Sequence, residues 1–87
     1  MQNFYFTFGS DSRFPYGRDD YVLVQADDLR AAIAAFRAVH PDRPGTNLVN
    51  CASYYTEEDF DRTCRKYYDN RDPIETIAIT LTVTKGE

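Results

Sequence analysis

The segment DDLRAAIAAFRAVHP, residues 27–41, constrains the fold more than any other part of the chain. Its apolar residues recur at helical spacing, at Leu29, Ile33, Phe36 and Val39. Asp27 or Asp28 can cap the start of a helix, and Pro41 cannot continue one. Because a helix with one apolar face has to pack against another element, the rest of the chain must provide that element.

Four other segments have the residue patterns of β-strands: residues 3–8, 21–26, 48–55 and 77–83. The first has a phenylalanine at every second position, which is typical of a strand with one buried face. The second, YVLVQA, is almost continuously apolar, so we expect it at the centre of a sheet. The third has mixed polarity, and the last has a strong preference for strand.

A second helix is predicted from Thr56 to about Asn70, because a threonine followed by acidic residues is typical of a helix start. Its buried stripe is expected to consist of Phe60, Cys64 and Tyr67. The element order β-β-α-β-α-β predicts an α+β fold, a single two-layer domain with a four-stranded, mainly antiparallel or mixed sheet and both helices on one face. Tyr5 would then lie on the partly open face of that sheet.

Length and charge limit what the chain can be. Residues 1–87 are predicted to form a single domain with a small core. The net charge of −4 argues against direct nucleic-acid binding, because that function needs a basic face. The N-terminus lacks the basic region of a signal peptide, and no apolar run is long enough to span a membrane. We therefore expect a cytoplasmic protein in which Cys51 and Cys64 are free thiols.

The residue inventory offers little for catalysis. His40, the only histidine, follows the predicted helix, where the helix dipole favours a charged imidazole. Cys51 is interpreted as an inward-facing strand residue rather than a nucleophile. The chain has no phosphate-loop motif, and the acidic cluster at 57–61 lacks the spacing of a calcium loop. The sequence predicts a non-enzymatic protein with no catalytic residue, no metal site and no cofactor.

The loop of residues 9–20 joins the first two predicted strands and has two interpretations. Hairpin loops usually have about 2–5 residues, and longer ones are often functional. One interpretation is a site for a small ligand such as a nucleotide, built from Arg13, Arg18, Tyr16 and Tyr54. The other is a structural loop that packs on itself, with its arginines paired to neighbouring aspartates.

Several stretches together carry a resemblance that covers roughly residues 3–60. They are FYFTFGSD near the start, a short Phe-Pro loop, VQADDLRAAIAAF, HPDRPGT and NCASYYTEEDF. In these stretches the chain resembles a family of small uncharacterised proteins encoded by bacteriophages and prophages of gut Firmicutes. The resemblance implies an accessory factor, a class that includes inhibitors of host defence such as anti-CRISPR proteins. Such factors occlude a functional surface or sequester a signalling nucleotide.

An acidic inhibitor can compete for a basic groove on its target. The acidic residues cluster at 19–28 and 57–61, and they would form one patch if both clusters shared an edge of the sheet. The predicted partner-binding residues are Glu57, Glu58, Asp61, Tyr54, Tyr68, Asp19 and Asp20. The expected partner is a host protein, such as a nucleic-acid-binding defence effector, and not a membrane. A symmetric homodimer through an edge strand is a further alternative.

Overall fold

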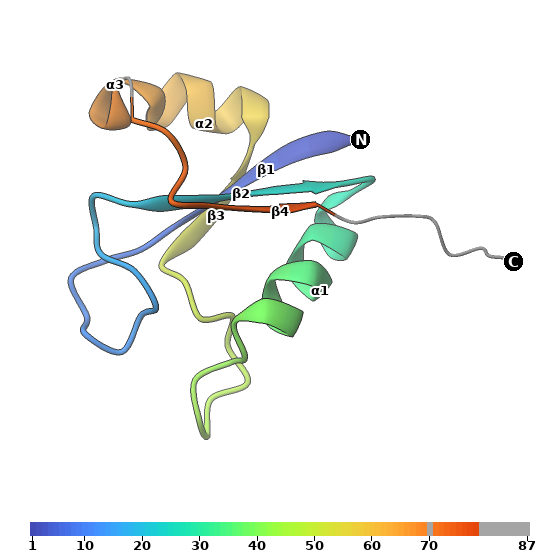
Figure 1. Cartoon of the computed structure of the whole chain (residues 1–87), viewed down its shortest axis with the longest axis vertical. Helices are drawn as coiled ribbons and strands as arrows, with labels where there is room; N and C mark the ends of the chain where they lie inside the picture. Colours follow the sequence, from blue (N-terminus) through green and yellow to red (C-terminus); the bar gives the residue numbers. More distant parts are fainter. Residues whose placement is uncertain (70, 79–87) are drawn as a thin grey trace, which may run out of the picture.

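The alternating phenylalanines near the N-terminus lie in strand β1 of a four-stranded sheet, as the computed structural model shows (Figure 1). The structure describes residues 1–69 and 71–78. Its strands are β1 (Gln2–Thr7), β2 (Tyr21–Ala26), β3 (Ser53–Thr56) and β4 (Glu75–Ala78). The order in the sheet is β3-β1-β2-β4. β1 is antiparallel to β2 and β3, whereas β2 and β4 are parallel, so the predicted mixed sheet is confirmed.

The first helix, α1 (Leu29–Val39), has the bounds that its sequence predicts. The side chain of Asp28 accepts a hydrogen bond from the backbone N–H of Ala31 at 2.8 Å, and the helix ends at His40, directly before Pro41. The second predicted helix is divided into α2 (Glu57–Thr63) and α3 (Arg65–Tyr68), with Cys64 between them. Thr56 caps α2 as expected, because its hydroxyl accepts from the N–H of Asp59 at 3.2 Å.

The helices lie on opposite faces of the sheet, so the expectation of two layers with both helices on one face is wrong (Figure 1). α1 covers the face that carries Phe4 and Phe6, and α2 and α3 cover the face that carries Tyr5. The sheet order explains the difference. The connection through α1 leads from β2 to β3, and the connection through α2 and α3 leads back across the sheet to β4. Two crossovers of the same hand that run in opposite directions place their helices on opposite faces.

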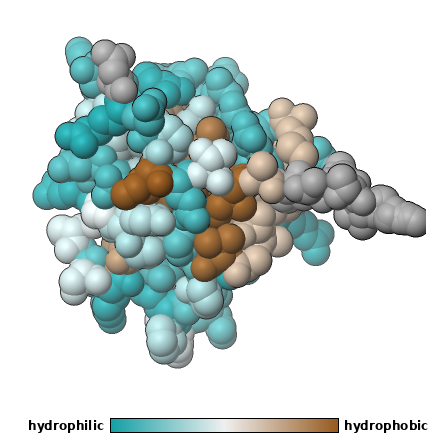
Figure 2. Space-filling model, in the orientation of Figure 1, coloured by the Kyte–Doolittle hydropathy of each residue, from teal (hydrophilic) through white to brown (hydrophobic). Residues whose placement is uncertain are grey.

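Both faces of the central strands are therefore buried by aromatic side chains. On the α1 face, Phe6 stacks on Phe36 with ring centroids 4.5 Å apart. On the other face, Tyr5 stacks on Phe60 at 4.1 Å. All four side chains are buried, so Tyr5 does not lie on an open face as the sequence suggested. Each aromatic ring buries a large apolar area, so these side chains form much of the core of a chain this short. The face of the molecule in Figure 2 is mostly hydrophilic, with a few hydrophobic residues near its centre.

The interruption at Cys64 changes which tyrosine faces the core. Residues 60 and 67 are almost two full turns apart in a continuous helix, which is why Tyr67 was expected in the buried stripe. In the structure Tyr68 is 5% exposed and packs against Phe60, whereas Tyr67 is 58% exposed. Cys64 is the C-cap of α2 and the N-cap of α3. The break at this residue rotates the last helical turn relative to α2, so that Tyr68 rather than Tyr67 faces the core.

The last two strands also differ from their predicted bounds. β3 begins at Ser53 rather than at residue 48, and Leu48 is exposed in the irregular segment that precedes it. β4 begins at Glu75, two residues before the predicted start. The remainder of the predicted last strand, residues 79–83, lies outside the described residues.

Candidate functional site

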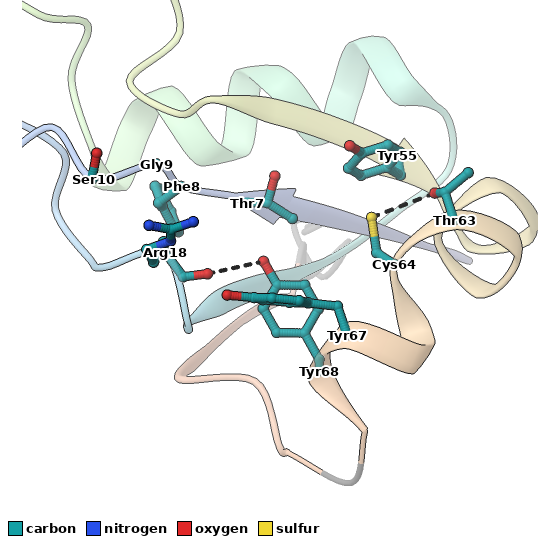
Figure 3. Close-up of a pocket in the computed structure, with 10 residues that line it drawn as sticks. All are labelled: Thr7, Phe8, Gly9, Ser10, Arg18, Tyr55, Thr63, Cys64, Tyr67 and Tyr68. Atoms are coloured by element: carbon teal, nitrogen blue, oxygen red, sulfur yellow. Dashed lines mark hydrogen bonds between the residues drawn. The ribbon is translucent and has the colours of Figure 1, made fainter.

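A groove of about 550 Å³ lies where the loop of residues 9–20 meets the helices α2 and α3 (Figure 3). We call it the Arg18–Tyr67 groove. It is lined by the end of β1, by Arg18 and by side chains of β3, α2 and α3. The side chains used below are Ser10, Arg18, Tyr55, Cys64, Tyr67 and Tyr68. The sequence could not indicate this groove, because it forms only when segments far apart in the chain are brought together.

Two consecutive tyrosines hold the end of the loop against α3. The hydroxyl of Tyr68 donates to the backbone carbonyl of Arg18 at 3.5 Å (Figure 3). The hydroxyl of Tyr67 donates to Oδ1 of Asp19 at 2.8 Å. The two rings meet edge to face, with centroids 5.0 Å apart. Arg18 is thus fixed through its backbone, which leaves its side chain free for other contacts.

The side chain of Arg18 has no acidic partner among the described residues. It is exposed and lines the same groove as the two tyrosine rings (Figure 3). Burial raises the pKa of Tyr68 to about 12, so this hydroxyl remains a neutral donor at ordinary pH. The groove therefore combines one available guanidinium with aromatic surface and hydroxyl groups.

The other wall of the groove contains a free thiol. Cys64 is partly buried between α2 and α3, and its sulfur lies 3.4 Å from the hydroxyl of Thr63. A hydrogen bond with Cys64 and burial raise the pKa of Tyr55. Cys51, in contrast, is buried on the α1 face, and burial raises the pKa of its thiol to about 11. Both cysteines are free, as predicted.

The two arginines of the loop differ in their surroundings: Arg13 is paired as the structural interpretation expects, whereas the ligand-site interpretation remains a prediction for Arg18. Arg13 donates from Nη2 to Oδ2 of Asp11 at 2.9 Å and from Nε to the same carboxylate, as the structural interpretation expects. These hydrogen bonds lower the pKa of Asp11 to about 2. Arg18 has no such partner within residues 1–69 and 71–78. Of these two arginines, only Arg18 lines the Arg18–Tyr67 groove and is therefore a candidate binding element there.

The four residues predicted for a ligand site do not come together. Only Arg18 lines the groove. Tyr16 is partly buried on the α1 face, where its ring meets Phe8 edge-on and its hydroxyl donates to Glu75 at 3.2 Å. Tyr54 lies on the same face in the edge strand β3, with its ring 5.6 Å from Phe6. The sequence predicted Tyr67 to be buried rather than part of a site, because its exposure depends on the interruption at Cys64.

The predicted acidic patch is divided between the two ends of the sheet. Glu57 lies beside the start of β1, where its carboxylate accepts from the side-chain amide of Asn3 at 2.9 Å. Asp19 and Asp20 precede β2 and therefore lie near the end of β1. Asp61 is paired with Arg65 at 2.7 Å, which reduces the charge of the helical cluster.

Tyr68 has to be removed from the predicted partner-binding set, because its side chain is buried and holds the loop. Tyr54 remains, with 41% of its surface exposed, and so do Glu57 and Glu58 at the start of α2. These three residues lie at and directly after the edge strand β3.

His40 has an acidic neighbour that the sequence did not suggest. Its Nε2 lies 2.6 Å from Oε1 of Glu75, and its ring meets that of Tyr16 edge to face. Within the described residues, no three histidine, cysteine or acidic side chains gather as metal ligands would. In that same part of the chain, no helix has the length and apolar character needed to cross a membrane.

Comparisons of the chain with models of known families, with curated proteins and with solved structures find no match. The function therefore has to be inferred from the groove and the surfaces themselves.

Proposed function

We propose that the protein is a non-enzymatic binding protein that takes a small anionic ligand with a planar ring, such as a nucleotide, in the Arg18–Tyr67 groove. In the setting that the sequence resemblance implies, it would act in the cytoplasm of a bacterial host as a phage accessory protein that sequesters this ligand. The observation that carries the proposal is that the available guanidinium of Arg18 and the exposed ring of Tyr67 line the same groove.

The side chains of the groove suit the two halves of such a ligand. A guanidinium binds phosphate through two parallel hydrogen bonds, and these are stronger than hydrogen bonds between neutral groups. A tyrosine ring offers a stacking surface, which contributes about 1–3 kcal/mol per base in proteins that bind single-stranded nucleic acids. Ser10 also lines the groove. The loop is already held by Tyr67 and Tyr68, so little ordering is required on binding.

A thermal-shift screen with mono-, di- and cyclic nucleotides tests the proposal. A ligand at one hundred times its Kd stabilises the folded chain by about 2.7 kcal/mol, which is a readily measured shift. Arg18→Ala should abolish the shift without changing the melting temperature of the free protein, because Arg18 forms no ion pair within the described residues.

Arg30→Ala is the matched control for this experiment. Arg30 is an exposed arginine on α1, on the opposite face of the sheet, and its removal changes the net charge equally. An equal loss of binding in both variants would mean that general charge, and not the groove, is responsible. The absence of a shift with every nucleotide would rule out the proposed ligand class.

A second candidate function, inhibition of a host protein, is favoured by the edge strand β3. Its outer edge is unpaired within the described sheet, and it carries the exposed Tyr54. Glu57 and Glu58 follow directly. Exposed strand edges accept a strand from a partner, and tyrosine is enriched at interaction hot spots. A target with a basic groove, such as a nucleic-acid-binding defence effector, would complement the acidic end of this edge.

Salt dependence tests this second function. Binding to a host protein captured from a bacterial lysate should weaken strongly as ionic strength rises. Glu58→Lys should weaken it strongly, whereas Asp72→Lys, the same charge change at an exposed aspartate outside the predicted partner-binding set, should not. If binding is insensitive both to salt and to Glu58→Lys, the edge strand and its acidic end are excluded as the interface.

A further inference from the structure

A second cavity, of about 600 Å³, lies beside the segment of residues 41–50. We call it the Arg43–Asn50 cavity, and the residues used below are Arg13, Pro41, Arg43, Pro44, Thr46 and Asn50. It shares no lining residue with the Arg18–Tyr67 groove. Arg13 comes from the loop of residues 9–20, so the cavity lies where this loop meets the segment that follows α1.

Two of the residues that line this cavity each have a buried polar atom that lacks a hydrogen-bond partner within the described residues. Nε of Arg43 and Oδ1 of Asn50 are both buried, and neither has a hydrogen-bond partner within residues 1–69 and 71–78. Buried polar groups are hydrogen-bonded in the great majority of proteins, because an unmade bond leaves the cost of desolvation uncompensated. One of these atoms is a donor and the other an acceptor, and both residues line the same cavity.

The surroundings of Arg43 are positively charged although the chain as a whole is acidic. Asp11 accepts from Arg13 at 2.9 Å and lies 3.9 Å from Nη1 of Arg43, so two guanidinium groups share one carboxylate. Asp42 is paired with Arg37 at 2.9 Å. Three guanidinium groups thus face two carboxylates, which leaves one positive charge at this cavity in a chain of net charge −4. An anion is the ligand that this balance favours.

The cavity is also formed before any ligand arrives. The guanidinium of Arg43 lies 5.2 Å from the centre of the Phe14 ring, a cation–π contact that fixes its position. Pro41 and Pro44 give rigid apolar walls. The hydroxyl of Thr46 donates to the carbonyl of Arg43 at 2.9 Å, which closes the turn between them. Binding in a preformed cavity avoids the entropy cost of ordering its walls.

We propose that the Arg43–Asn50 cavity is a second binding site, for a phosphate monoester that carries a free hydroxyl group, as a sugar phosphate does. The phosphate accepts from Nε of Arg43 and from Arg13, and the hydroxyl donates to Oδ1 of Asn50. The apolar walls contact the carbon skeleton between the two groups. This site is independent of the function proposed for the Arg18–Tyr67 groove.

Three probes separate the two halves of the proposed ligand: inorganic phosphate, glycerol and glycerol 3-phosphate. Titration of each into the ¹⁵N-labelled full chain, followed by ¹H–¹⁵N spectra that include the arginine Nε–H signals, reports on Arg43 directly. We expect saturable shifts of the Arg43 signal with phosphate, tighter binding with glycerol 3-phosphate and no effect of glycerol. If no anion shifts the Arg43 signal over the millimolar range, the proposal is wrong.

Substitutions identify the residues that bind. Arg43→Lys keeps the charge but removes the Nε donor. It should lower the affinity for glycerol 3-phosphate by roughly tenfold or more, as expected for the loss of a charge-assisted hydrogen bond. Arg30→Lys, on α1, is the matched control and should have no effect. Asn50→Ala should reduce the affinity for glycerol 3-phosphate to that for phosphate. An equal effect of Arg43→Lys and Arg30→Lys would overturn the assignment.

Two further variants keep the result interpretable. If Arg43→Lys does not fold, Arg13→Gln replaces it, because the Arg13 side chain is 73% exposed and is expected to be dispensable for folding. Arg13→Gln should also lower the affinity of the cavity for phosphate and for glycerol 3-phosphate. An unchanged affinity would contradict the arrangement in which Arg13 and Arg43 share one carboxylate. Arg18→Ala should leave binding at this cavity unchanged. A loss of binding there would place the phosphate in the groove and exclude the second site.

Discussion

Nε2 of His40 lies 2.6 Å from Oε1 of Glu75, so the residue that ends α1 is joined to the first residue of β4. The same carboxylate accepts from the hydroxyl of Tyr16 at 3.2 Å. Three segments, namely the loop of residues 9–20, the end of α1 and the edge strand β4, thus meet at one partly buried carboxylate.

His40→Ala should destabilise the fold by about 1–3 kcal/mol, because it leaves the partly buried Glu75 without its main partner. The measurement is the free energy of unfolding from urea denaturation. His40→Gln retains a donor and should lose less. Equal stability of the alanine variant and the unchanged protein would mean that Glu75 is satisfied by Tyr16 and solvent alone.

The two neighbouring tyrosines should respond very differently to truncation. Tyr68→Ala removes a buried ring that packs on Tyr21 and Phe60, and we expect a loss of about 3–5 kcal/mol. Tyr67→Ala removes an exposed ring and one exposed hydrogen bond, for which about 1 kcal/mol is expected. Denaturation of both variants measures the difference. Losses in the reverse order would contradict the rotation of the last helical turn at Cys64.

Asp11 should titrate well below an ordinary aspartate. Hydrogen bonds from Arg13 lower its pKa from 3.8 to about 2. A depressed folded-state pKa contributes stability that is present above the unfolded value and is lost as the pH falls from about 4 towards 2. In Arg13→Ala the pKa should return towards 3.8, which NMR titration of the Asp11 carboxyl group measures. An unchanged pKa in this variant would show that Arg13 is not the cause.

The two thiols should react at different rates with an alkylating reagent. Cys64 is partly buried and lines the Arg18–Tyr67 groove, whereas Cys51 is buried and its pKa is raised to about 11. Because the thiolate is the reactive form, Cys51 should react far more slowly. Mass spectrometry of the Cys51→Ser and Cys64→Ser variants measures each rate. A bound nucleotide should protect Cys64 alone, and faster reaction of Cys51 would contradict the burial described here.

Local patterns predicted the elements well, because their causes lie within a few residues. The cap at Asp28 and the stop at Pro41 set the bounds of α1, and the alternating phenylalanines set β1. The pairing of Arg13 with Asp11, two residues away, was one of the two interpretations of the loop.

Features that depend on distant residues could not be predicted in the same way. The faces that the helices cover follow from the order of strands in the sheet, which periodicity within one segment does not specify. The contact between His40 and Glu75 and the Arg18–Tyr67 groove join segments far apart in the sequence. The exposure of Tyr67 follows from the interruption of the helix at Cys64, and no glycine or proline near this position indicates a helix break.

The parallel pairing of β2 with β4 has a consequence for how the chain folds during synthesis. Val22 lies opposite Glu75, and Val24 lies opposite Ile77. Until these later residues have left the ribosome, one edge of β2 in the nascent chain has no partner strand. The contacts between residues far apart in the sequence therefore form last. The native sheet therefore cannot close before residues 75–78 have been synthesised, so a chain cut before Glu75 should be a substrate for chaperones and proteases rather than a smaller version of the domain.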